Sequence, residues 1–336
     1  MRPVDLADAL KRDGLIAPDV DPLPFGSAGR PWYISLVLGA AGWLASLSGF
    51  VFVVLLFDFD TAGELAVAGL VVLGAGYGLY TADREGAFFG QLALALSLAG
   101  QLLLIGAVAA GSESAVATTA FAALLCSGLV FVLPDHFARL LSAFFACIAW
   151  AMAVRVFWWG EDALWDLQME VAFTPALLAW LVIWIPVAWT VHRLIQREVT
   201  WMTTGARSIA RPALTGLLVA LSAGTWTSEP LAAFSFWTPP TDVASNWLSI
   251  WPLLGTAAAL FAAVSAYRLR HRAMIGVAIA GALLHVVHFY YLLGVTLVTK
   301  SYIMLVFGAV LLLAARRLVG RTDVAGSPVV GSEATS

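Results

Sequence analysis

The sequence predicts an all-α, polytopic transmembrane helix bundle, and three observations lead to this prediction. Of the 336 residues, 61% are hydrophobic and 12% are charged, whereas about 25% of the residues in a soluble domain are charged. The apolar residues gather in runs long enough to cross a bilayer. Nearly all the basic residues fall in alternate connections between these runs. Soluble globular proteins, disordered chains and basic nucleic-acid binders are therefore excluded.

Most of the chain consists of apolar runs long enough to cross a membrane. One span needs about 20 mostly apolar residues. Together they account for the composition and leave no room for a soluble domain. The run at 211–227 is the weakest, because Glu229-Pro230 and a segment rich in Trp and Pro follow it. About ten spans are predicted, at 33–57, 62–81, 88–110, 115–133, 138–159, 173–192, 211–227, 247–267, 273–294 and 301–318.

The distribution of charge predicts the orientation of these spans. All but two of the 18 Lys and Arg residues lie in the amino-terminal segment, in the connection after every second run, or in the carboxyl tail. Short loops that carry Lys and Arg stay in the cytoplasm, so both termini are predicted to be cytoplasmic. Arginine supplies nearly all of the basic residues, as is common in GC-rich bacteria. The charge pattern therefore predicts a multi-pass membrane protein.

Three segments are predicted along the chain. Residues 1–32 form a cytoplasmic amino-terminal segment, in which apolar and charged residues alternate over 4–16 as in a short amphipathic helix. Residues 33–318 form the transmembrane helical domain. Residues 319–336 are rich in Gly, Ser and Thr and are predicted to be a disordered tail.

His285 and His288 are two candidate site residues inside the predicted span at 273–294. Their spacing places both imidazoles on one face of a helix, where they could share a metal ion or build a proton relay. Zinc would need one or two further ligands from other helices, and no HExxH or CxxC motif accompanies the pair. The alternative is structural: two polar side chains hydrogen-bonded to neighbouring helices.

Arg155 and Lys300 are the two basic residues that depart from the charge pattern. Arg155 lies four residues before Trp159, so its side chain is expected to snorkel toward the membrane interface. One hypothesis is that Arg155, His288 and Lys300 converge on an outward-facing polar cleft that holds an anionic group. The alternative is that both cations pair with outer acidic residues such as Asp162.

Some polar and small residues inside the predicted spans concern either a pathway or helix packing. Gln101 is deep enough in its predicted span to join a pathway, whereas Ser97 is expected to hydrogen-bond a neighbouring helix. Gly74 and Gly78 have the GxxxG spacing that lets helices approach closely. Together with the residues of the two preceding paragraphs, the candidate ligand-binding residues are Arg155, His285, His288, Lys300 and Gln101.

No sequence motif identifies a reaction. The chain has no Walker motif, no GxSxG and no Rossmann glycine pattern, so no catalytic residue, metal ligand or cofactor is predicted. Cys126 and Cys147 lie in apolar runs and indicate no disulfide framework. An enzyme is the less favoured class.

Two stretches of the chain resemble an uncharacterised family of bacterial multi-spanning membrane proteins, domain of unknown function 4401. One is Pro31-Trp32-Tyr33 with the apolar run to Leu47. The other is Tyr290-Tyr291 through Thr296-Leu297, then Lys300-Ser301 and a helix with Gly308 and Leu311-Leu312-Leu313 that ends at Arg316-Arg317. Where the family often has three tyrosines, this chain has two. The resemblance implies a multi-pass protein of the bacterial inner (cytoplasmic) membrane, with membrane proteins encoded nearby as partners. It assigns no functional residue.

Four functional classes remain open. The first is a transporter-like protein that handles a small molecule or an ion. The second is a non-catalytic subunit or scaffold of an envelope membrane complex. The third is a membrane-embedded enzyme or metalloprotein that uses His285 and His288. The fourth is a signalling or sensing component that acts through the amino-terminal segment, for which the sequence has no motif. In each case the surroundings are the lipid bilayer and, for the second, partner membrane proteins; no nucleic acid is involved.

Overall fold

The computed structural model describes residues 61–82, 87–161, 172–203, 206–228, 250–292 and 295–306, with isolated positions within 37–51 and 308–313. These residues form helices joined by turns, and no strand occurs among them, which confirms the all-α class. The helices are α3 (Ala62–Ala82), α4 (Ala87–Ser112), α5 (Ala115–Val132), α6 (His136–Trp159), α7 (Phe173–Gln196), α8 (Glu198–Thr203), α9 (Arg207–Ala223), the 3-10 helix η2 (Gly224–Ser228), α10 (Ile250–Arg268) and α11 (Arg272–Leu292).

Seven of these helices are long and apolar enough to cross a membrane: α3, α4, α5, α6, α7, α10 and α11. Each matches a predicted span within a few residues. The span predicted at 33–57 falls largely outside the described residues, and a shorter apolar helix at Leu297–Val306 lies at the start of the last one. The count of ten spans and the cytoplasmic termini stay predictions, and the segments 1–32 and 319–336 lie outside the described residues.

Local signals in the sequence explain where the helices begin and end. Thr61 and Glu64 form a reciprocal capping box at the start of α3, each side chain accepting from the other's backbone N–H at 3.3 Å. Ser114 caps α5. The α5 helix ends before Pro134, because the residue preceding a proline is biased to extended backbone. Asp135 then accepts from the Phe137 N–H at 2.8 Å and starts α6.

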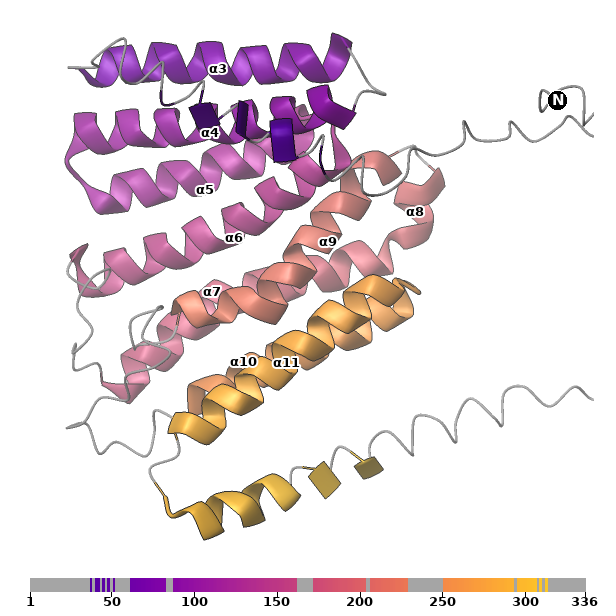
Figure 1. The fold of residues 1–336 in the computed structure, drawn as a ribbon. Helices are drawn as coiled ribbons and strands as arrows, with labels where there is room; N and C mark the ends of the chain where they lie inside the picture. Colours follow the sequence, from indigo (N-terminus) through magenta and orange to yellow (C-terminus); the bar gives the residue numbers. More distant parts are fainter. Residues whose placement is uncertain are drawn as a thin grey trace, which may run out of the picture. The chain divides into compact units, whose positions relative to one another are not determined.

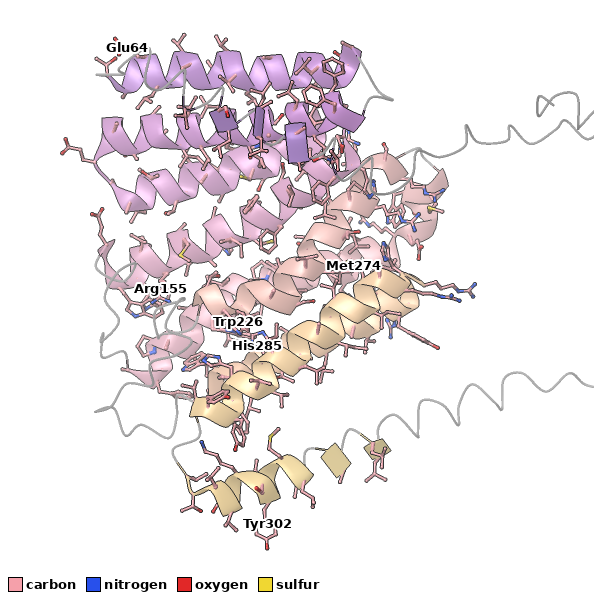
Figure 2. The ribbon with its side chains drawn as sticks, viewed as in Figure 1. Glu64, Arg155, Trp226, Met274, His285 and Tyr302 are labelled. Atoms are coloured by element: carbon pink, nitrogen blue, oxygen red, sulfur yellow. The ribbon has the colours of Figure 1, made fainter. Side chains whose placement is uncertain are left out.

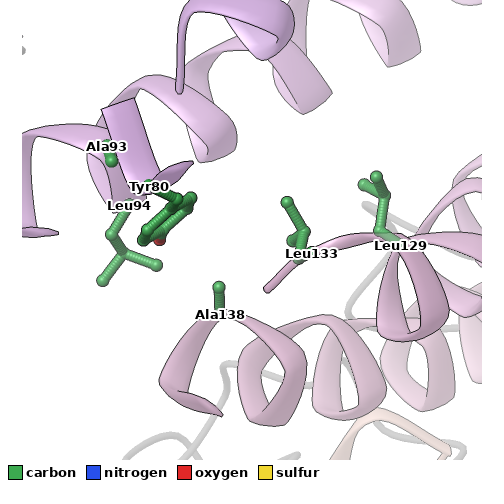
Figure 3. Close-up of a cluster of buried hydrophobic side chains, with 6 residues drawn as sticks. All are labelled: Tyr80, Ala93, Leu94, Leu129, Leu133 and Ala138. Carbon is green, nitrogen blue, oxygen red and sulfur yellow. The ribbon is translucent and has the colours of Figure 1, made fainter. Parts of the chain in front are cut away.

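The chain forms two compact units. Unit 1 comprises Met1–Ala153 with Trp201–Gly216, and unit 2 comprises Val154–Thr200 with Leu217–Ser336. In unit 1, α3, α4 and α5 lie side by side in chain order (Figure 1). A buried apolar cluster joins them to the beginning of α6 (Figure 3); its members are Tyr80, Ala93, Leu94, Leu129, Leu133 and Ala138.

Glycines set the closest approach in unit 1. A Cβ added at Gly76 would lie 2.7 Å from Ser97 Oγ, and one added at Gly100 would lie 2.6 Å from the Leu73 backbone nitrogen. A Cβ at Gly74 or Gly78, by contrast, would meet no atom within 4 Å among the described residues. The α3–α4 contact therefore uses Gly76 and not the GxxxG pair, which faces away from it.

Unit 2 contains α7, the end of α9 with η2, α10 and α11. The helices α10 and α11 lie side by side (Figure 1) and are joined by a tight turn at 269–271. Arg270 adopts φ 53° in this turn, and the His271 N–H reaches back to the Ala266 carbonyl at 3.0 Å. His271 Nδ1 then accepts from the Met274 N–H at 3.3 Å. This turn closes α10 and caps α11 within three residues, which fixes the register of the pair.

Candidate functional site

The candidate site begins where α9 stops being an α-helix. At Gly224 the chain tightens into the 3-10 helix η2, which ends at Ser228, two residues before Pro230. Pro230 has no N–H to continue a helix, and the residue before it disfavours helical backbone. Thr225, Trp226 and Ser228 consequently project from a helix end inside the bundle, and all three make side-chain hydrogen bonds to other helices.

His285 on α11 is hydrogen-bonded to two of these side chains, those of Thr225 and Trp226. Its imidazole is fully buried, with 0% of the residue exposed. The Trp226 indole N–H donates to His285 Nδ1 at 2.7 Å, and Thr225 Oγ1 lies 2.9 Å from Nε2. Figure 2 shows the side chain of Trp226, from η2, next to that of His285, from α11. An indole N–H can only donate, so Nδ1 holds a lone pair and Nε2 carries the ring proton, which it donates to Thr225. The imidazole is neutral in this arrangement.

Two glycines make room for this arrangement. A Cβ added at Gly255 on α10 would overlap the imidazole of His285. A Cβ added at Gly281 on α11 would overlap the backbone carbonyl of Ser222 on α9. Close approach of three helices thus encloses one polar ring.

A second hydrogen-bonded chain holds η2 against α7. The Trp184 indole N–H donates to Ser228 Oγ at 2.6 Å, and Ser228 Oγ donates to the Thr225 carbonyl at 2.8 Å. Trp184 and Ser228 are both buried. The Thr225 hydroxyl accepts from His285. The two hydrogen bonds through Ser228 therefore also fix the position of this acceptor beside the imidazole.

His288 lies one helical turn beyond His285 and contacts the same indole. The ring centroids of His288 and Trp226 are 6.4 Å apart in an edge-on arrangement, and those of His285 and Trp226 are 5.1 Å apart. The residue is half-buried, in contrast to His285. The prediction that the two histidines share a face is confirmed, and Trp226 is the group that touches both.

Lys300 and Arg155 contact other aromatic rings of unit 2. Lys300 Nζ lies 4.9 Å from the centre of the Tyr290 ring, near the end of α11. Arg155 extends along α6 toward its end, with Cζ 5.8 Å from the centre of the Trp159 ring. Only 2% of the residue is exposed. The side chain expected to reach the membrane interface is therefore covered by protein atoms. Convergence of Arg155, His288 and Lys300 on one anion stays a prediction.

Gln101 belongs to unit 1, apart from the unit that holds the other four candidates. It is buried on α4, and its Oε1 lies 3.7 Å from the Cys126 thiol, which donates weakly to it from α5. Both Cys126 and Cys147 are free thiols in buried positions. This contact gives Gln101 a structural partner, and its place in a pathway stays untested.

The described residues contain no group of three or more His, Cys, Asp or Glu side chains placed to bind a metal ion. Both nitrogens of His285 already hold hydrogen bonds. What the arrangement can do chemically is hold or exchange a proton, because a neutral imidazole offers one lone pair and one N–H.

Sequence reasoning missed Thr225, Trp226 and Gly255. A signal for the first two was present: the polar stretch Gly224-Thr225-Trp226-Thr227-Ser228 interrupts an otherwise apolar run just before Pro230. Such interruptions are where transporters place binding groups. Nothing in the sequence marked Gly255, because its importance depends on which ring faces it.

The chain matches the family model described as domain of unknown function (DUF4401) over residues 31–322. This match covers most of the chain, so the protein belongs to that family, as the two stretches of resemblance predicted. No curated protein and no solved structure matches the chain. The family description assigns no reaction, ligand or partner, so the functional argument depends on the geometry above.

Proposed function

We propose that this member of the DUF4401 family is a transporter-like protein that moves protons, alone or together with a small solute, through the helix bundle of unit 2. It would do so in the bacterial inner (cytoplasmic) membrane with both termini in the cytoplasm. The seven apolar helices support the membrane location in general, and the asymmetry of Lys and Arg supports this orientation.

The observation that carries the proposal is the environment of His285. Polar side chains within a membrane are costly, and a titratable one marks a functional site by default. His285 lies about 20 Å along α11 from Arg272, at about 1.5 Å per residue, which is well inside a hydrocarbon core of about 30 Å. It is also held at the point where α9 becomes η2. Irregular helices that present polar groups near the midplane are typical of transporters.

A proton is the ion that suits this site best. The imidazole gains and loses protons near neutral pH in its unperturbed state, and His288 supplies a second imidazole against the same indole. The metalloprotein alternative has less support, since it needs ligands beyond the pair. The subunit alternative predicts no dependence of any flux on His285.

Proton flux into liposomes tests the proposal. Purified protein is reconstituted with the pH-sensitive dye pyranine inside, and a potassium gradient with valinomycin drives proton entry. We expect flux above that of protein-free liposomes, and we expect His285→Gln to reduce it to that background. Glutamine is the informative replacement, because its amide can accept from Trp226 and donate to Thr225 but cannot take up a proton.

The matched control is His192→Gln. His192 is an exposed histidine on α7 that contacts Gln196 at 2.8 Å, so its replacement should leave the flux unchanged. Equal monodispersity and melting temperature of the two variants would show that both are folded. A wild-type protein without flux, or a His285→Gln variant that conducts like wild type, would overturn the proposal.

A further inference from the structure

The nitrogen that must receive an incoming proton is the one that Trp226 occupies. Since Nε2 of His285 already carries a proton, the only lone pair on the ring is at Nδ1, and the Trp226 N–H points at it across 2.7 Å. A proton added at Nδ1 would place two N–H donors against each other. One of them must leave before the imidazolium can form.

We propose that Trp226 is the gate of the proton site: its indole must move off Nδ1 before His285 can be protonated. The inference rests on the proposed function, and it assigns the controlling step to a residue that does not itself titrate. Trp226 is a positioning residue in this scheme, because it acts through the imidazole and not on the proton directly.

The proton balance of the cycle follows from the two nitrogens. A proton from the aqueous phase binds the Nδ1 lone pair once the indole has left, and the ring becomes an imidazolium. The imidazolium then releases that same proton from Nδ1 on the other side of the membrane. The ring that remains is neutral and still carries its original proton on Nε2, so Trp226 can donate to Nδ1 again. One proton enters and one leaves, and the ring recovers its starting state.

The groups around the imidazole are consistent with a gate made by the indole alone. On its own helix the ring has His288, which lies one turn away and against the same indole. The end of α9 and η2 contribute the Ser222 backbone, Thr225 and Trp226, and α10 contributes Gly255. Among these groups His288 is the one that titrates, and Trp226 touches both imidazoles.

The segment that carries Trp226 is anchored on both sides of it, whereas the indole itself is only half-buried. Trp226 belongs to the five-residue 3-10 helix η2. The neighbouring residues Thr225 and Ser228 are buried and anchored to α11 and α7. The indole can therefore swing on its own side-chain torsions while its segment stays in place.

Trp226→Phe tests the gate in the liposome assay. Phenylalanine keeps an aromatic ring but removes the N–H, so Nδ1 becomes free to accept a proton. We expect the flux through Trp226→Phe to exceed that of wild type by about three- to tenfold, the range that corresponds to the loss of one hydrogen bond. The control is Trp180→Phe, which makes the same change at a buried indole of α7 whose nitrogen has no hydrogen-bond partner among the described residues. Its flux should equal that of wild type.

A spectroscopic readout separates gating from a structural role. The chain has five histidines, so ¹⁵N labelling of histidine gives few signals, and His285→Gln identifies the one of interest. At neutral pH we expect wild-type His285 to show an unprotonated, hydrogen-bonded Nδ1 and a protonated Nε2. In Trp226→Phe the Nδ1 signal should move toward that of a lone pair without a donor.

The outcomes distinguish the two proposals. Flux that depends on His285 but is unchanged or reduced in Trp226→Phe would overturn the gate and leave the proposed function standing. A wild-type protein without flux would overturn the proposed function and, with it, the gate. A wild-type His285 with a protonated Nδ1, or an Nδ1 signal that Trp226→Phe leaves unchanged, would overturn the gate whatever the flux.

Discussion

In unit 1, a glycine lets the backbones of α3 and α4 pack against each other. In unit 2, a glycine lets the backbone of α10 pack against the polar side chain of His285. Gly100 faces the Leu73 nitrogen, and Gly255 faces the imidazole of His285. Both contacts depend on the missing Cβ. The first gains only van der Waals contact, which is the usual source of helix association in a bilayer. The second encloses a ring whose hydrogen bonds must all be kept, so that one substitution there disturbs several partners at once.

The polar groups of the two units differ in the same way. In unit 1, Ser97 Oγ is buried with no hydrogen-bond partner among the described residues, and Gln101 has only a thiol donor at 3.7 Å. In unit 2, both nitrogens of His285 and the hydroxyl of Ser228 are engaged. The buried polar groups Ser97 and Gln101 of unit 1 are tolerated within packed helices, whereas those around His285 in unit 2 form a connected network.

The largest expected effect comes from filling the space beside the imidazole. Gly255→Val would push its methyl groups into His285 and break the bonds to Trp226 and Thr225. We expect the free energy of unfolding in detergent to fall by about 3 kcal/mol, the sum of overpacking and of lost buried hydrogen bonds. Denaturant titration measures it.

Gly276→Val is the control for this substitution. Gly276 lies on α11, and within the described part of the chain a Cβ there would meet nothing within 4 Å, so Gly276→Val makes the same change in helix propensity without the clash. Equal losses in the two variants would contradict the account of Gly255.

A smaller loss is expected in the interface of unit 1. Gly100→Ala would place a methyl group 2.6 Å from the Leu73 nitrogen, and backbone cannot move aside as a side chain can. The helices must separate slightly, at a cost of about 2 kcal/mol. Gly106 is on the same helix, and a Cβ there would meet no atom of the described residues within 4 Å. Gly106→Ala should therefore be neutral or slightly stabilising, because alanine favours helix. Thermal unfolding of the pair compares them, and similar melting temperatures would refute the contact.

The link between α7 and η2 is expected to contribute about 1 kcal/mol, the usual net value of a buried hydrogen bond. A double-mutant cycle of Trp184→Phe and Ser228→Ala isolates it, since these two side chains share the bond of 2.6 Å. The coupling energy from the cycle should be positive and near that value. A coupling energy of zero would show that η2 is held by packing alone.

The sequence predicted the elements of this fold well because local signals determine them. The apolar runs give the spans, and Pro134 gives the end of α5 to within one residue of the prediction. The shared face of His285 and His288 follows from helical spacing alone. These features need no knowledge of which helix packs against which.

The site was predicted only in part because it depends on pairing between distant segments. Trp226 and His285 are 59 residues apart in the chain, and no periodicity connects them. The glycines show the same limit. The GxxxG spacing of Gly74 and Gly78 was visible, but the face that α4 covers carries Gly76, which only the packing reveals.

The smallest expected effect has opposite signs in the two units. Ser97 and Ser222 are both fully buried, but Ser222 Oγ donates to the Leu218 carbonyl at 2.7 Å, whereas Ser97 Oγ has no partner among the described residues. Ser97→Ala removes an unsatisfied hydroxyl and should raise the free energy of unfolding by about 0.5–1 kcal/mol. Ser222→Ala removes a satisfied one and should lower it by a similar amount. Denaturant titration of both variants decides the sign, and a loss in Ser97→Ala would mean that the polar groups of unit 1 are as well paired as those of unit 2.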